Sequence, residues 1–123
     1  MEEIYNKDGK NEMKDLYVLN NQLDVKKRIV IFGTGYHAKD TYLELIKRGI
    51  KPDYFADRKP DVIGLKLYGI EIISEESLKD LECQIIVAST AWENIYNRLV
   101  RKGIGTERIY VDRNRYEDME IEL

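Results

Sequence analysis

Residues 33–38 have a composition and spacing typical of a phosphate-binding loop. They read Gly-Thr-Gly-Tyr-His-Ala, a G-x-G-x-x-A pattern. In such loops the first glycine (Gly33) permits a tight turn, the second (Gly35) lets a phosphate approach the backbone, and Ala38 lets a helix pack closely on a sheet. A helix beginning here offers free N–H groups and partial positive charge to an anion. The pattern predicts a nucleotide-type ligand; the alternative is that the glycines only shape a strand-to-helix turn.

An acidic residue lies at the position where such folds hold a ribose. Asp57 follows Gly35 by 22 residues and ends an apolar run, so we expect its carboxylate to accept from a ribose diol. Arg58 comes next and could meet the 2′-phosphate of NADP, with an ordinary surface arginine as the alternative.

Ser89 and Thr90 end another apolar run, where open α/β sheets place ligands. Their hydroxyls could reach a ribose or pyrophosphate from the opposite side of the cleft. The alternative is that they cap the following helix, for which Thr90 is the better candidate. His37, at the expected helix start, could donate to a phosphate or a sugar, or simply face solvent.

Metal and disulfide chemistry are disfavoured by the residue counts. The sequence has one cysteine, Cys83, and one histidine, His37, so we expect no disulfide and no metal site. Cys83 is interpreted as a structural residue in a loop, and Trp92 as a core residue rather than a platform for a base.

The scaffold that would position these side chains alternates strands with helices. Continuous apolar runs at residues 28–32 and 84–88 are typical of strands buried on both faces. Shorter strands are predicted at 53–57, 70–73 and 108–111, with a connection at 58–69. This alternation predicts an α/β fold, a three-layer Rossmann-like open parallel sheet of about five strands in the order 3-2-1-4-5.

Three helices complete the prediction. Two are amphipathic, with apolar stripes formed by Ala38, Tyr42, Leu45 and Ile46 and by Trp92, Ile95, Tyr96, Leu99 and Val100. A brief third helix is capped by Ser74. Residues 45–58 also resemble residues 99–113, which predicts two equivalent helix–loop–strand units.

Several segments together resemble one protein family. They are residues 33–39, 55–57, 64, 69–70 and 74–78. They resemble the Rossmann-like N-terminal domain of bacterial sugar O-acyltransferases of the sialic-acid and bacillosamine type, and related modules of surface-polysaccharide enzymes. Covering residues 27–111, the resemblance implies a nucleotide-sugar held by Gly33, Gly35, His37 and Asp57. Tyr36 replaces a glycine of many members, which would narrow the phosphate pocket.

The acyltransferase activity itself is not implied. In that family a following left-handed β-helix of hexapeptide repeats carries the acetyl-CoA site and the catalytic histidine, and no such repeat occurs among the 123 residues. We also find no Tyr-x-x-x-Lys pair and no Ser–His–acid set, so we expect no catalytic residues and no complete active site in this chain.

Composition divides the chain and narrows its partners. We expect a polar arm (1–26), a nucleotide-binding domain (27–113) and an acidic tail (114–123). A net charge of −3 without a basic cluster disfavours nucleic acid, and no apolar run reaches the roughly 18–20 residues that span a bilayer. We expect a cytoplasmic protein without a membrane partner. The exposed ends and sheet edges fit a homodimer or a place in a larger sugar-biosynthesis enzyme.

The function predicted from sequence is a nucleotide- or nucleotide-sugar-binding module of surface-polysaccharide biosynthesis. The phosphates of a UDP-sugar or of NAD(P) would be held by Gly33, Thr34, Gly35, Tyr36 and His37. Asp57 would hold the ribose, Arg58 the 2′-phosphate of NADP, and Ser89 and Thr90 would line the opposite side of the cleft. The alternatives are a regulatory domain that senses NAD(H) or CoA, and a degenerate Rossmann domain that mediates assembly.

Overall fold

The computed structural model describes residues 23–111. Most of the predicted arm and the whole predicted tail lie outside the described residues, so the domain boundaries stay predictions.

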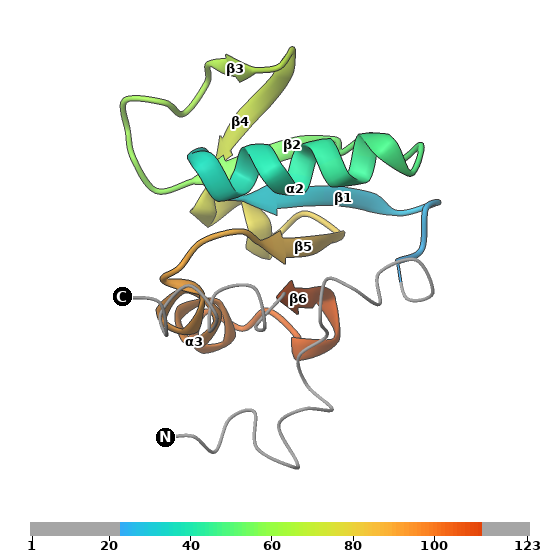
Figure 1. The fold of residues 1–123 in the computed structure, drawn as a ribbon. Helices are drawn as coiled ribbons and strands as arrows, with labels where there is room; N and C mark the ends of the chain where they lie inside the picture. Colours follow the sequence, from blue (N-terminus) through green and yellow to red (C-terminus); the bar gives the residue numbers. More distant parts are fainter. Residues whose placement is uncertain (1–22, 112–123) are drawn as a thin grey trace, which may run out of the picture.

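A six-stranded sheet forms the centre of the fold (Figure 1). Its strands are β1 (Arg28–Phe32), β2 (Tyr54–Asp57), β3 (Lys66–Leu67), β4 (Ile70–Ser74), β5 (Cys83–Val87) and β6 (Ile109–Val111). The order is β3-β4-β2-β1-β5-β6, and every pair is parallel except β3 with β4. The predicted α/β class and the predicted order of the five parallel strands are confirmed.

The short strand β3 was not predicted. It lies within the expected connection 58–69 and pairs with β4 through a turn at Tyr68 and Gly69, whose φ angles are 55° and 79°. Two residues are too few to give an alternating pattern in the sequence.

The helices lie on both faces of the sheet, which confirms three layers (Figure 1). They are α2 (Tyr36–Lys47), α3 (Trp92–Arg101) and the 3-10 helices η4 (Glu75–Lys79) and η5 (Thr106–Arg108). Strand β1 explains the arrangement, because Ile29 and Ile31 pack in one core cluster with α2, whereas Val30 and Phe32 pack in another with α3. Both faces are covered, so the strand is apolar at every position after the exposed Arg28.

The predicted helical stripes are correct except at their last positions. Ile46 and Val100 are exposed, whereas the other apolar positions are buried or partly buried. Both residues directly follow a fully buried leucine, Leu45 or Leu99, and one residue along a helix turns the side chain by about 100°, to the edge of the stripe.

Two equivalent helix ends confirm the internal resemblance. Gly49 and Gly103 both have positive φ, 79° and 95°. The following N–H groups make the same bonds: Ile50 donates to the carbonyl of Leu45 at 2.9 Å, and Ile104 to that of Leu99 at 3.2 Å. Each glycine therefore ends its helix in the same left-handed cap.

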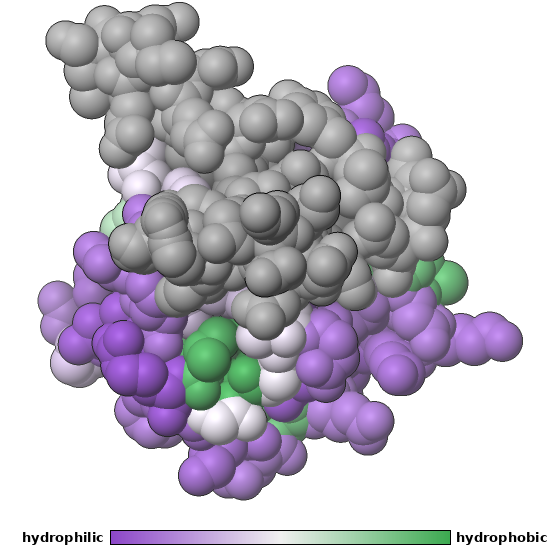
Figure 2. Space-filling view, turned by 90° about the horizontal axis from the view of Figure 1, so that it is seen from below, coloured by the Kyte–Doolittle hydropathy of each residue, from purple (hydrophilic) through white to green (hydrophobic). Residues whose placement is uncertain are grey.

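The surface is largely charged. Seen from below (Figure 2), the described residues are mostly hydrophilic around a small hydrophobic area. Charged residues make up 35% of the chain, and this face shows that many of them cover the surface while the apolar side chains fill the two core clusters.

Candidate functional site

A cavity of about 360 Å³ opens where β1, β2 and β5 end and α2 and α3 begin. Its wall is made by Phe32, Gly33, Thr34, Gly35, Tyr36, His37, Asp57, Arg58, Lys59, Ala88, Ser89, Ala91, Ile95 and Arg98. Open parallel sheets bind ligands at this edge, and the volume is typical of a small-molecule site. Of the nine predicted site residues, the structure brings together all except Thr90.

The two loop glycines differ in what the fold demands of them. Gly33 has φ of 125°, and a Cβ there would lie 2.8 Å from the carbonyl oxygen of Ala88, so its glycine is required by the fold. Gly35 has φ of −102°, and a Cβ there would meet nothing within 4 Å. Neither packing nor φ demands a glycine at position 35, which leaves its open backbone free for an outside group.

The start of α2 has no cap of its own. Gly35 is the N-cap residue and provides no side-chain hydrogen bond, and the first turn holds no acidic residue. The helix end therefore keeps its partial positive charge toward the cavity. Tyr36 lines the opening but is 83% exposed, so most of its ring lies in solvent.

Asp57, at the end of β2, accepts a hydrogen bond from the loop after β1. Its Oδ2 accepts from the hydroxyl of Thr34 at 2.7 Å, and its Oδ1 accepts from the N–H groups of Arg58 at 2.7 Å and Lys59 at 3.1 Å. The side chain is 13% exposed. A carboxylate has about four acceptor positions, so a ribose hydroxyl would share Asp57 with these three donors.

Ser89, not Thr90, makes the bond at the start of α3. The N–H of Ala91 donates to the Ser89 hydroxyl oxygen at 3.0 Å. The N-cap position falls on Ala91, one residue later than the sequence suggested, so Thr90 precedes the cap and stands exposed outside the cavity wall. The expectation that Thr90 caps this helix is wrong for that reason.

Sequence reasoning missed two cationic residues of the wall, Lys59 and Arg98. Lys59 directly follows Arg58 and could have been included with it. Arg98 lies on the polar side of the α3 pattern, where nothing in the spacing points to a cavity. Together with Arg58 they place three cations beside the single carboxylate of Asp57, on a chain whose net charge is −3.

Arg98 belongs to a buried ion-pair cluster. Glu75, the first residue of η4, accepts from Arg98 at 2.8 Å and from the Lys102 ammonium at 2.6 Å. Burial acts to raise the pKa of Glu75, but the hydrogen bonds and charges of Arg98 and Lys102 outweigh it, so the pKa lies below its ordinary value. Glu75 is therefore ionised at neutral pH.

Cys83 is buried, and it is the first residue of β5 rather than part of a loop as expected. Burial raises the pKa of its thiol, despite the nearby guanidinium of Arg108. Trp92 is buried in the core cluster beneath α3, as predicted.

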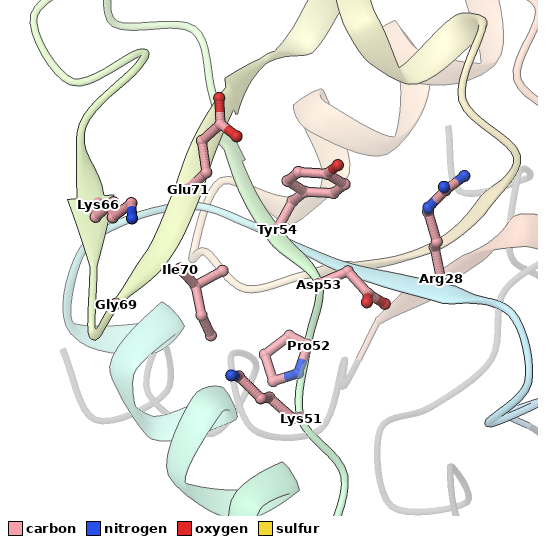
Figure 3. Close-up of a pocket in the computed structure, with 9 residues that line it drawn as sticks. All are labelled: Arg28, Lys51, Pro52, Asp53, Tyr54, Lys66, Gly69, Ile70 and Glu71. Atoms are coloured by element: carbon pink, nitrogen blue, oxygen red, sulfur yellow. The ribbon is translucent and has the colours of Figure 1, made fainter.

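A second cavity of about 470 Å³ lies at the opposite end of β1 and β2 (Figure 3). Its charged side chains do not converge, because Arg28 and Asp53 lie on one side and Lys66 and Glu71 on the other. Asp53 already accepts from the N–H of Ile29 at 2.9 Å. Although larger, this cavity has no helix start in its lining, and its one glycine, Gly69, has a positive φ of 79° that the turn between β3 and β4 already explains.

Within residues 23–111, no group of three or more His, Cys, Asp or Glu side chains could hold a metal ion. Over the same residues, every helix is too short or too polar to cross a membrane.

Comparisons with known proteins relate the chain to one family. No curated protein matches the sequence. Among solved structures, UDP-D-quinovosamine 4-dehydrogenase from Vibrio fischeri has 18% sequence identity and a TM-score of 0.48, over 69% of this chain and 75% of that chain. Similarity at this level carries no information on ligand or reaction. The model of the C2185-like, N-terminal family matches residues 25–110, which run from just before β1 into β6. The chain belongs to the C2185-like, N-terminal family.

Proposed function

We propose that this chain is a nucleotide- or nucleotide-sugar-binding module whose ligand occupies the cavity beside the glycine-rich loop. The observation that carries the proposal is Gly35. It stands beside an uncapped helix start with nothing of the chain within 4 Å of a Cβ, so the glycine is best explained by a group that must approach the backbone.

The charges of the cavity support an anionic ligand. Arg58, Lys59 and Arg98 line it with one carboxylate, Asp57. A phosphate at the α2 start would receive backbone N–H groups and the partial charge of the helix, with these cations nearby. His37 lies in the same wall and could donate to a phosphate or a sugar.

The resemblance of residues 33–39, 55–57 and 74–78 to the nucleotide-binding domain of sugar O-acyltransferases favours a UDP-sugar over NAD(P), and a role in surface-polysaccharide biosynthesis. The sequence has neither a Tyr-x-x-x-Lys pair nor hexapeptide repeats, so binding without chemistry is the role that we propose for the described domain.

A thermal-shift panel tests the proposal. It would include UDP, UDP-N-acetylhexosamines, GDP- and dTDP-sugars, NAD, NADP, AMP and CoA. A ligand at 100 times its Kd stabilises the fold by about 2.7 kcal/mol, which raises Tm by several degrees. The matched variant is Gly35→Val, which should fold with only a modest loss of Tm and lose the shift.

Each result has a distinct meaning. A shift with UDP-sugars that Gly35→Val abolishes supports the proposal. A shift with NAD(H) or CoA instead indicates a sensor domain. No shift with any compound, or a shift that survives Gly35→Val, overturns the loop site and leaves assembly as the role of this fold.

A further inference from the structure

The part of the cavity wall that α3 provides contains the guanidinium of Arg98, which Glu75 holds in place. Arg98 donates from Nε to both oxygens of Glu75, at 3.1 Å and 2.9 Å, and from Nη2 to Oε1 at 2.8 Å. This two-point contact fixes the plane of the guanidinium. Among the wall residues, Arg98 lies farthest from the start of α3.

Glu75 is well suited to hold it. Its side chain is 2% exposed, and its Oε2 also accepts from Lys102 at 2.6 Å. Two cations therefore share one buried carboxylate. The other carboxylate near Lys102, that of Glu76, is 80% exposed, where water screens its charge. The cluster holds two cations and two carboxylates, and Glu75 is the buried carboxylate and the partner of Arg98.

The guanidinium also keeps donors to spare. Arginine has five N–H bonds, and Glu75 engages one on Nε and one on Nη2. The other three have no hydrogen-bond acceptor among the residues that the structure describes. Arg98 is 21% exposed and lines the cavity, so these donors can meet a ligand without leaving Glu75.

We infer that Arg98 is a second anion-binding position of the cavity, so that the site prefers a ligand with two adjacent anionic groups, such as a nucleoside diphosphate, over a monophosphate. The first group would lie at the start of α2 and the second at the free edge of Arg98. Glu75 acts as a positioning residue. This inference rests on the proposed function and names its ligand class.

The test measures the preference for a diphosphate. Isothermal titration with UDP, UMP, ADP and AMP gives the ratio of the monophosphate Kd to the diphosphate Kd for the full chain. One charge-assisted contact changes affinity by about tenfold to a hundredfold, so we expect a ratio of that size in the unaltered protein. Arg98→Gln should bring the ratio close to one.

Lys102→Gln is the matched control. Lys102 also pairs with Glu75, but it is not part of the cavity wall. Its loss should lower Tm about as much as Arg98→Gln does while leaving the ratio unchanged. If Arg98→Gln does not fold, the double variant Glu75→Gln with Arg98→Gln removes the buried charge together with its partner and should show the same loss of preference.

The outcomes separate the two proposals. Binding of mono- and diphosphates with equal affinity, or a preference that Arg98→Gln leaves intact, overturns the role of Arg98 and leaves nucleotide binding standing. If Lys102→Gln loses the preference for a diphosphate as completely as Arg98→Gln does, the role of Arg98 is also overturned, because the effect would then be structural. Binding of none of the four nucleotides by the unaltered protein overturns the role of Arg98, whereas the thermal-shift panel with its nucleotide-sugars decides the proposed function.

Discussion

The hydroxyl of Thr34 donates to the carboxylate of Asp57 over 2.7 Å and joins the glycine-rich loop to the next strand of the sheet. Asp57 is nearly buried and also receives the N–H groups of Arg58 and Lys59. The residue predicted to hold a ribose therefore first organises the loop that would hold the phosphates.

Replacing Thr34 by valine should cost about 1 kcal/mol of unfolding free energy, because a hydrogen bond to a charged group is lost while the shape of the side chain is kept. Urea denaturation followed by circular dichroism would measure it. The same change at Thr90, which is exposed and makes no hydrogen bond to the described part of the chain, is the control and should be neutral. Equal effects at both positions would show that the contact contributes nothing.

The two loop glycines should respond differently to alanine. Gly33→Ala places a Cβ 2.8 Å from the Ala88 carbonyl oxygen at φ of 125°, so we expect a loss of about 2 kcal/mol or more. Gly35→Ala meets no atom of the chain within 4 Å beyond its sequence neighbours, so we expect only the small cost of a poorer N-cap, less than about 1 kcal/mol. Thermal unfolding of both variants without ligand checks the pair, and a large loss at Gly35 would contradict the open site described for it.

The Glu75 cluster should make stability depend on pH in the acid range. Because its pKa is lower in the folded protein than the ordinary 4.5, the unfolded chain binds a proton first as pH falls. The stabilisation is present above pH 4.5 and is lost as pH falls from there through the lower, folded pKa. Denaturant titrations at neutral pH and at several values below 4.5 would measure the loss.

Glu75→Gln should lower stability at neutral pH by about 2 kcal/mol and flatten this acid dependence, since two cations lose their buried partner. Glu76→Gln is the matched control. Its carboxylate also pairs with Lys102 but is 80% exposed, so the change should stay within about 0.5 kcal/mol. If the unfolding free energy of Glu75→Gln falls as steeply with decreasing pH as that of the unaltered protein, other carboxylates cause the dependence.

Cys83 should react slowly with thiol reagents in the folded protein. It is the only cysteine of the chain, is buried at the start of β5, and has a raised pKa, so little thiolate is exposed. We expect labelling by a disulfide reagent to be at least about a hundredfold slower than in urea, because the sheet must open first. Labelling at the unfolded rate would show that β5 is not protected.

The sequence allowed the parallel strands, their order and the cavity edge to be predicted, because these follow from local features. Residues 29–32 are apolar at every position, which is typical of a strand covered on both faces, and the glycines at 33 and 35 mark the turn that follows. Ile46 and Val100 are exposed against the prediction, since periodicity gives the centre of an apolar stripe but not how wide a part of the helix the sheet covers.

The pairing of Arg98 with Glu75 could not be predicted. The two residues are 23 positions apart, on a helix and a short 3-10 turn that meet only when β4 and β5 have taken their places in the sheet. In the sequence Glu75 fits equally well as an ordinary first-turn acid after Ser74. Partners across a fold depend on topology, which composition and spacing do not contain.

The pairing of β1 with β5 is the line at which the chain changes its direction of winding. One wall of the cavity comes from the half wound outward through β2 and β4, and the other from the half that carries α3 and β6. A molecule that touches both walls would connect the two halves of the sheet across the pairing of β1 with β5. Its binding would then raise the cooperativity of the whole sheet, so that amide exchange slows in both halves together rather than in the loop alone.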